Sequence, residues 1–331
     1  MARRIVGRAA AAVVPAVLIV LGVVAFAATG GTTRLSLLGA RPFHTTQVVG
    51  QDFPKRLIDP SGIPQTLASP PNRILSAVLA SDEILTALVA PERLAAVTYL
   101  VDEPGLSDVA RLLLPDLPRI HAEAETILAL QPDLVVLASY TRATTVRLLA
   151  SAGVPVVRFQ WYRSFGDIMD SIRMLAAAVG ADDNGARLVA DMQRRIAEVE
   201  KRAQGLARPR VLYYSGGGYS AGHDTLIDAM ITLAGGHNVA RDVGLRGQGR
   251  LPLEVAVSLR PEVVLVSEWE RTTGGNRAAV FLHHPVWAAV PAVQDGRVYG
   301  INGAWLSSVS HYSVKALEAI ARVLHPEAFA L

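Results

Sequence analysis

The stretch Glu125-Thr-Ile-Leu-Ala-Leu-Gln-Pro-Asp-Leu-Val-Val-Leu-Ala138 returns later in the chain as Glu254-Val-Ala-Val-Ser-Leu-Arg-Pro-Glu-Val-Val-Leu-Val-Ser267. In each copy a helical pattern leads to a proline, and the residue before a proline is pushed out of the α region, so a helix must end there. A fully apolar run follows, which is typical of a strand buried on both faces of a parallel sheet. The two copies therefore predict two similar α/β lobes, with a ligand between them.

Length and composition agree with two folded lobes. The chain has 331 residues, of which 51% are apolar and 18% charged, so it can build two cores and is not a disordered chain. It has no cysteine, which excludes disulfides, thiolate metal sites and a lipid-modified N-terminal cysteine.

The N-terminal segment resembles an export signal. Arg3, Arg4 and Arg8 precede an uncharged apolar stretch over residues 9–28, and Ala25-Phe26-Ala27 offers a small-x-small cleavage site. The stretch is also long enough to span a bilayer, so a cleaved signal peptide and an uncleaved inner-membrane anchor both stay open. Without those three arginines, 29 basic residues balance 29 acidic ones, and nothing indicates a nucleic-acid partner.

Turn residues and apolar periodicity divide the chain into five parts. We expect a signal peptide or anchor over 1–28, a linker with a small hairpin over 29–71, an N-terminal α/β lobe over 72–163, connecting helices over 164–205, and a C-terminal α/β lobe over 206–331.

Several element ends are predicted by their residues. Ser81 and Ser164 are expected N-caps, and Gly180 is expected to end the first connecting helix. The turn residues Pro60-Ser61-Gly62 predict the hairpin, and residues 107–114 are expected to be helical.

An ordered series of short phrases resembles one known family. The phrases are Arg73-Ile-Leu-Ser, Ser81-Asp-Glu-Ile-Leu, Leu130-Gln-Pro-Asp-Leu-Val-Val, Gly153-Val-Pro-Val, Leu233-Ala-Gly-Gly-His-Asn, Leu259-Arg-Pro-Glu-Val-Val, His284-Pro-Val-Trp and Gly296-Arg-Val-Tyr. Over roughly residues 55–325 the chain resembles the periplasmic substrate-binding proteins of iron-siderophore, haem and cobalamin ABC importers.

That resemblance implies a fold and a function. It implies two parallel-sheet α/β lobes joined by a long, rigid helical connector, with a shallow cleft between the lobes. It further implies a periplasmic, non-catalytic protein without a cofactor of its own, which captures a metal chelate and delivers it to a membrane permease. We expect such a receptor to be a monomer.

Candidate ligand residues follow the predicted strands, because ligands of open α/β sheets bind beyond the carboxyl ends of the strands. Flat aromatic rings bury large apolar areas, and arginine pairs with carboxylate or catecholate oxygens, so the combination suits a partly anionic chelate. Taken singly, each aromatic residue could equally serve packing. The candidates are Tyr99, Tyr140, Arg142, Trp161 and Tyr162 in the first lobe, and Tyr214, Tyr219, Trp269, Arg271 and Trp305 in the second. Trp287, by contrast, is expected in the core.

Histidines and glycines indicate neither metal nor nucleotide sites. The neighbours His283 and His284 point to different faces of any regular element, so they do not form a metal site together. His311 is placed either near the cleft with Trp305 or at a helix end. The run Gly216-Gly217-Gly218 lacks the spacing of a phosphate-binding loop.

The resemblance also implies one acidic residue on each lobe for docking to the permease. In the first lobe Glu103 is the candidate. In the second lobe the family's Gly-Gly-Glu-Asn reads Gly235-Gly236-His237-Asn238, and His237 cannot supply a carboxylate. Either Asp242 replaces it or the docking differs.

Two other classes of function stay open. A membrane-anchored sensor or accessory protein could use the same fold, which His237 and an uncleaved anchor would favour. A chelate-processing enzyme would need His or carboxylate residues converging on the cleft, whereas the predicted cleft loops carry aromatic residues and arginine.

Overall fold

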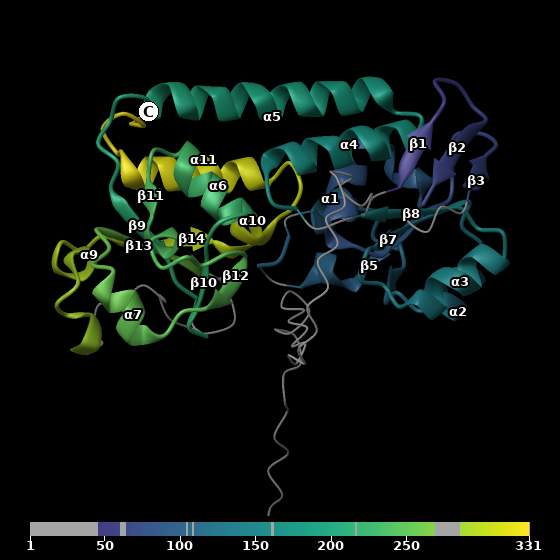
Figure 1. Cartoon of the computed structure of the whole chain (residues 1–331). Coiled ribbons are helices and arrows are strands. Elements are labelled where there is room, and N and C mark those ends of the chain that lie inside the picture. The colour runs from purple at the N-terminus through teal and green to yellow at the C-terminus, as the bar shows by residue number, and fades with distance from the viewer. Residues whose placement is uncertain are drawn as a thin grey trace, which may run out of the picture. The chain divides into compact units, whose positions relative to one another are not determined.

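Two parallel sheets, one in each half of the chain, form the framework (Figure 1). This computed structural model describes residues 46–59, 64–103, 105–107, 109–159, 162–215, 217–268 and 285–330. The strands of the first sheet are, in spatial order, β6 (Arg119–Ile120), β5 (Leu94–Thr98), β4 (Ile74–Ser76), β7 (Leu134–Ala138) and β8 (Val156–Phe159). Those of the second are β11 (His237–Asn238), β9 (Arg210–Tyr213), β13 (Val263–Glu268) and β14 (Val298–Asn302). The predicted fold class, two parallel-sheet α/β lobes, is confirmed.

The apolar strands of the repeat have no polar face because both of their faces are covered. In β7, Leu134 and Val136 pack into one hydrophobic cluster while Val135 and Leu137 pack into another. β13 behaves in the same way, with alternate residues in two clusters. Side chains alternate across a strand, so each sheet is buried between two apolar layers.

Both copies of the repeat are bound to the first strand of their own lobe by an arginine and an acid. Arg73 donates to the carbonyl oxygens of Leu130 (2.6 Å) and Gln131 (3.0 Å), and the Asp133 carboxylate accepts the backbone N–H of Arg73 at 2.9 Å. These bonds satisfy helix carbonyls that have no partner within the helix, and they fix the start of β4.

The second copy repeats this arrangement. Arg210 donates to Leu259 O at 2.9 Å, and Glu262 accepts the N–H of Arg210 at 2.7 Å. The residues before the two prolines, Gln131 and Arg260, both have positive φ, 49° and 45°. The backbone therefore leaves the helix at the same point in both copies, as the prolines predict.

Helices cover the faces of both sheets. Those of the first lobe are α1 (Leu79–Leu88), α2 (Ala124–Ala129) and α3 (Ala143–Ser151), with short 3₁₀ turns η1 (Pro91–Arg93), η2 (Tyr99–Asp102) and η3 (Ala110–Leu112). Those of the second are α6 (Leu226–Leu233), α7 (Leu253–Ser258), α9 (Pro291–Gln294), α10 (Gly303–Ser307) and α11 (Ser313–Leu324), with η4 (Val239–Arg241) and η5 (Pro285–Trp287). A small antiparallel pair, β10 (Tyr219–Ala221) and β12 (Gln248–Arg250), completes the second lobe.

Two predictions about local structure are wrong. Ser81 lies inside α1 rather than at its N-cap, because its hydroxyl bonds Ser76 Oγ (2.6 Å) and Val78 O (2.8 Å). Within residues 107–114, the described part forms only the 3₁₀ turn η3.

The connecting helices α4 (Phe165–Val179) and α5 (Asp182–Ala203) lie side by side (Figure 1). Ser164 caps α4 as predicted, in a reciprocal capping box with Asp167, and Gly180 ends it in the left-handed conformation. α5 packs against α1 of the first lobe and against α6 and α11 of the second. One helix therefore contacts both lobes.

The predicted hairpin is part of a small antiparallel sheet of β1 (Gln47–Val49), β2 (Lys55–Ile58) and β3 (Pro64–Leu67). Its turn lies outside the described residues. A side chain of β3 and one that precedes β1 satisfy the outer edge of β8, because Val156 N donates to Gln65 Oε1 (2.7 Å) and Arg158 N to Thr46 Oγ1 (2.8 Å). Covering an edge in this way prevents its pairing with another chain.

A buried lysine ties this sheet to the connector. Lys55 is 2% exposed, and its ammonium donates to Ala177 O at 2.9 Å and lies 3.4 Å from Asp182 Oδ2. It therefore places a positive charge at the carboxyl end of α4, where the helix dipole favours one. Arg93 adds a second donor there, to Val179 O at 2.7 Å.

We expect Lys55→Met to lower the free energy of unfolding by about 1–2 kcal/mol, since it keeps the apolar stem but removes the donor from a buried carbonyl. Urea denaturation measures the change. Arg56→Met, at the exposed neighbouring position of β2, is the matched control and should have little effect. Equal losses in the two variants would contradict a specific role for the Lys55 ammonium.

Candidate functional site

The strand order of the first sheet defines where a ligand can bind. From β4 the chain adds β5 and then β6 on one side, and afterwards β7 and then β8 on the other side, so the order of the parallel strands reverses between β4 and β7. In open α/β sheets the crevice beyond the carboxyl ends of such a pair is the usual ligand site.

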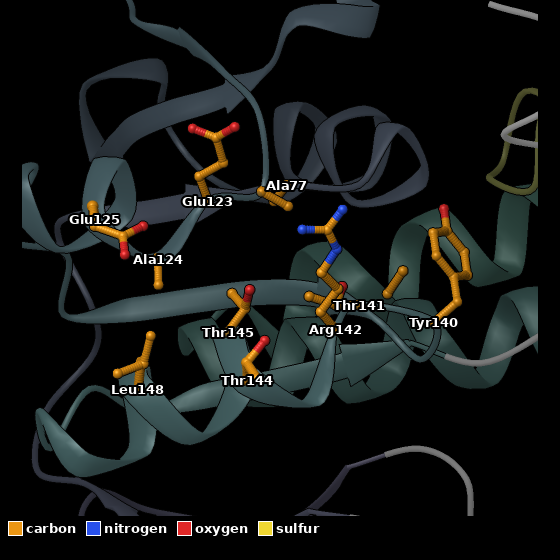
Figure 2. Close-up of a pocket in the computed structure, with 12 residues that line it drawn as sticks. Ala77, Glu123, Ala124, Glu125, Tyr140, Thr141, Arg142, Thr144, Thr145 and Leu148 are labelled. Carbon is orange, nitrogen blue, oxygen red and sulfur yellow. The ribbon is translucent and has the colours of Figure 1, made fainter. Parts of the chain in front are cut away.

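A pocket of about 460 Å³ opens at this point (Figure 2). Ala77, which follows β4, and Ala138, which ends β7, both line it, together with the segments that open α2 and α3. The complete lining is Ala77, Ala122, Glu123, Ala124, Glu125, Ala138, Tyr140, Thr141, Arg142, Thr144, Thr145 and Leu148.

The structure brings Tyr140 and Arg142 together in this pocket. Both follow β7 and line the pocket, and Tyr140 is 62% exposed. Figure 2 shows the two glutamates, Glu123 and Glu125, on one side of the pocket, Tyr140 on the other, and Arg142 between them. Four of the lining residues are alanines, whose small side chains leave space within the pocket.

The sequence reasoning missed the acidic side of the pocket. Glu125 begins the repeated phrase and Glu123 stands just before it, in the segment that leads from β6 into α2. Because β6 has only 2 residues, its sequence does not predict a strand, and no candidates were expected after it. The pattern that places Tyr140 at the carboxyl end of β7 also places the first turn of the preceding crossover helix nearby, which was the available signal.

In the second sheet the order of the parallel strands reverses between β9 and β13. Tyr214 follows β9 but lies in a hydrophobic cluster, 7% exposed, with its hydroxyl donating to Leu251 O at 3.1 Å. Its ring packs edge-on against Trp287 with centroids 5.4 Å apart. This is the environment of a core residue, so the structure gives no support to Tyr214 as a ligand contact. Trp287 is in the core, as predicted, at 3% exposure.

The other described candidates have separate surroundings. Tyr99 opens η2 and stacks on His121, with ring centroids 4.2 Å apart. Tyr162 packs beside Phe159 against the main core, and burial raises the pKa of its hydroxyl above the ordinary value. Unlike Tyr214, it is only partly buried.

Tyr219 and Trp305 are both partly exposed residues of the second lobe. Tyr219 begins β10. Trp305 lies in α10, with the ammonium of Lys315 5.5 Å from its ring centroid. The candidates Trp161, Trp269 and Arg271, and the pair His283 and His284, lie outside the described residues, so their roles stay predictions.

The docking candidates differ between the lobes. Glu103 is exposed directly after η2, while the neighbouring Asp102 is held by Arg119 at 2.9 Å. In the second lobe His237 Nε2 lies 2.7 Å from Asp242 Oδ1, and Arg210 contacts the other oxygen of Asp242 at 3.1 Å. Both oxygens of the Asp242 carboxylate are therefore engaged within the lobe.

Asp82 is a fully buried carboxyl group at the carboxyl ends of β4 and β5. Its Oδ2 accepts Thr98 N at 3.3 Å, while its Oδ1 has no hydrogen-bond partner among the described residues. Burial raises the pKa of Asp82 well above its ordinary value, although Ser76 and the Thr98 N–H favour the charged form. The protonated form is the one this environment favours.

His311 lies in the second lobe beside the connecting helix rather than near the pocket. Its ring stacks on Tyr312 with centroids 4.2 Å apart. Burial, reinforced by the charges of Lys315 and Arg195, lowers its pKa to about 4 from the ordinary 6.5. The neutral imidazole is therefore the form that fits the fold.

The described ranges contain no cluster of three or more His, Asp or Glu residues arranged to hold a metal ion. Nor does any helix within them combine the length and apolar character needed to cross a membrane. The apolar stretch over residues 9–28 is not among the residues described.

Residues 74–304 match the family described as "Periplasmic binding protein". The chain is 30% identical to a cobalamin-binding protein of Halobacterium salinarum over 62% of its length, and the match spans 56% of that relative. It is 23% identical to YvrC, an ABC transporter substrate-binding lipoprotein of Bacillus subtilis, over 84% of the chain and 87% of that relative.

Among solved structures, the chain is similar to apo RhuT, a periplasmic haem-binding protein of Roseiflexus sp. RS-1. The TM-score is 0.66 with 28% identity, over 78% of this chain and 99% of that one. The likeness covers both lobes of the present structure, because it extends over most of the described residues.

We expect Asp82→Asn to remove a pH dependence of stability. In the wild type the folded-state pKa is raised, so stability is full below the unfolded pKa and falls as pH rises through the folded pKa. The amide is neutral at all pH values and can still accept from Thr98 N, so the variant should be the more stable one at pH 8. Thermal unfolding between pH 4 and pH 8 measures this. A wild-type advantage that grows with pH would contradict it.

His311→Gln should act in the opposite pH range. The folded-state pKa of about 4 lies below 6.5, so the wild type keeps its full stability above pH 6.5 and loses it as pH falls toward 4. The loss between pH 7 and pH 5 should be on the order of 2 kcal/mol. Urea denaturation of both proteins at these two values gives the difference. Parallel losses in wild type and variant would show that His311 is not responsible.

Proposed function

The chain belongs to the periplasmic binding protein family, and from this premise we propose that it is an extracytoplasmic receptor that captures a metal chelate for an ABC import permease. The observation that carries the proposal is the pocket where the strand order of the first sheet reverses. The exposed residue Tyr140 and the guanidinium of Arg142 both line it. A large, flat ligand with a polar edge needs both, because the aromatic ring contacts its face and the arginine binds polar groups at its edge.

The relatives support a chelate as the ligand class. One is a cobalamin-binding protein and another a haem-binding protein, and both ligands are large metal macrocycles. The match spans only 56% of the cobalamin-binding relative, so the ligand of this chain is argued from its own pocket.

The charge of the pocket favours a ligand with neutral polar groups at its edge. Glu123 and Glu125 face a single arginine, Arg142, and threonine hydroxyls complete the polar lining. Carboxylates repel the propionates of haem and the oxygens of a ferric catecholate, whereas they accept hydrogen bonds from amide N–H groups. The amide-bearing periphery of a cobalamin is therefore the best complement.

A receptor binds its ligand without catalysing a reaction. The family and the structural neighbours are binding proteins, and the pocket combines one guanidinium, two carboxylates, hydroxyls and apolar groups around an open space. We propose accordingly that the protein is not an enzyme and carries no resident cofactor. A monomer would suffice, since each chain supplies both lobes.

Delivery to a permease is the further part of the proposal. YvrC is an ABC transporter substrate-binding lipoprotein, which supports the same partner class here. Glu103 is the proposed docking acid of the first lobe, because it is exposed and Asp102 is occupied by Arg119. In the second lobe His237 and Asp242 bind each other, so docking there would use another group or this pair as a unit.

Location outside the cytoplasm is proposed on the same basis. The family is extracytoplasmic, and residues 9–28 have the composition of a signal peptide or an inner-membrane anchor. N-terminal sequencing of the protein purified from its membrane and soluble fractions distinguishes a released receptor from a tethered one.

Tryptophan-fluorescence and calorimetric titrations of the full chain with cyanocobalamin, haemin and a ferric catecholate test the chelate proposal. We expect cyanocobalamin to bind most tightly, and Tyr140→Ala to weaken it about tenfold or more through lost ring contact. Arg147→Ala changes an exposed arginine of α3 that does not line the pocket, and it is the matched control for Arg142→Ala.

The double variant Glu123→Gln/Glu125→Gln should improve haemin binding relative to cyanocobalamin binding.

Each result has a distinct meaning. Failure of all three chelates to bind would reject the receptor proposal. Tighter binding of haemin by the wild type would keep the receptor and reject the argument from pocket charge. An unchanged affinity in both Tyr140→Ala and Arg142→Ala would place the site elsewhere.

A further inference from the structure

Glu83 is a buried carboxylate whose hydrogen-bond donors come from both lobes. It lies on α1 of the first lobe and is 2% exposed. Ser107, also of the first lobe, donates to Oε1 at 2.6 Å. Ser308 and Ser310, of the second lobe, donate to Oε2 at 2.7 and 2.5 Å. These four residues are called the Glu83 cluster below.

The serines of the second lobe are held in place for this contact. Ser308 Oγ and Ser310 Oγ lie 2.9 Å apart, and Ser308 Oγ also accepts Ser310 N at 3.2 Å. Ser310 Oγ accepts Tyr312 N at 3.2 Å, so the start of α11 is tied to the same group. Both serines are buried, which means that water does not replace the carboxylate as their partner.

A carboxylate in this position restricts the relative position of the two lobes more than apolar contacts would. Apolar surfaces can slide, because the hydrophobic effect has no direction. Hydrogen bonds to an ionised group are short and directional, and breaking one leaves a buried charge without a partner. Moving Ser308 and Ser310 away from Glu83 is therefore unfavourable in every direction.

The cluster joins two segments that each follow the carboxyl end of a strand, one in each sheet. α1 follows β4, whose carboxyl end lines the pocket through Ala77. Ser308 ends α10, which follows β14 of the second sheet and carries Trp305. The contact thus links the segment after a first-lobe strand to the segment after a second-lobe strand.

The lobes have a separate attachment through the connector. Arg195 of α5 binds Glu318 of α11 through two hydrogen bonds of 2.8 and 2.9 Å. A single attachment would leave the lobes free to rotate about it. Two attachments that involve different elements fix the angle between them.

We propose that Glu83 is a positioning residue, which sets the separation of the two lobes by holding Ser308 and Ser310. The inter-lobe distance follows from the contacts of the cluster and does not require a ligand. Its consequence for binding, a fixed distance between the first-lobe pocket and α10, rests on the proposed function.

The test measures the distance between the lobes directly. The chain has no cysteine, so Leu112→Cys and Val243→Cys introduce a unique pair for spin labels, one on each lobe and each at a position 47% exposed. Pulsed electron–electron double resonance then gives the distribution of distances between the two spin labels in the full chain without ligand. In the wild-type background we expect one narrow peak.

The double variant Ser308→Ala/Ser310→Ala should broaden this peak roughly twofold or shift it, since the second lobe loses its hold on the carboxylate. Ser313→Ala is the matched control, because Ser313 is equally buried but donates within its own lobe, to Ser310 O. Its distribution should equal that of the wild type. Ser107→Ala should also leave the peak unchanged, since Ser107 belongs to the same lobe as Glu83.

Glu83→Gln tests the negative charge. The amide keeps the shape of the side chain, but only its oxygen accepts hydrogen bonds, whereas both oxygens of the carboxylate do. It should broaden the peak as the double serine variant does. If the double variant does not fold, Ser308→Ala alone and Glu83→Gln carry the same comparison. A wild-type distribution in the serine variant and in Glu83→Gln would overturn the proposal, even if both were less stable.

Chelate binding provides a separate readout. If the wild type binds a chelate, variants with a broadened peak should bind it more weakly, while Ser313→Ala should not. If the wild type binds none, the proposed function fails, and the distance distributions still decide whether Glu83 positions the lobes.

Discussion

The structure depends on one constraint that occurs twice, the binding of a helix–proline–strand unit to the arginine that begins its lobe. Arg73 donates to two carbonyl oxygens at the end of its repeat helix and Arg210 to one, and Asp133 and Glu262 each accept the N–H of that arginine. Because the proline prevents the helix from continuing, those carbonyls need outside donors. The same bonds set the first strand beside the repeat strand, and in each sheet the strand order reverses between these two neighbours.

The consequence for function is that the scaffold decides where a ligand can bind before any particular side chain is considered. The pocket of the first lobe opens where β4 and β7 end, and Tyr140 and Arg142 lie there because they follow β7. Holding the second lobe in a fixed relation to this pocket requires contacts beyond either sheet. α5 supplies one set, and the buried Glu83 carboxylate with its serine donors supplies another.

The candidates that follow strands have different surroundings in the structure, for a physical reason. Tyr140 follows β7 and Tyr214 follows β9, yet Tyr140 is 62% exposed and Tyr214 only 7%. The difference arises from Trp287 and Leu251, which lie far along the chain and enclose Tyr214. Local pattern fixes the end of a strand on which a residue lies, but not the residues that distant segments bring against it. Trp161, Trp269 and Arg271 lie outside the described residues and stay predictions.

By itself the sequence determined the two α/β lobes, the buried repeat strands, the capped connecting helix and the family resemblance, because periodicity, prolines and caps act over a few residues. Only the tertiary structure decided that Lys55 binds the end of α4, that Glu123 and Glu125 share a pocket with Arg142, and that Glu83 takes hydrogen bonds from the other lobe. In the sequence these are ordinary charged residues. Their roles come from burial and from partners far away in the chain, and both depend on how the lobes pack.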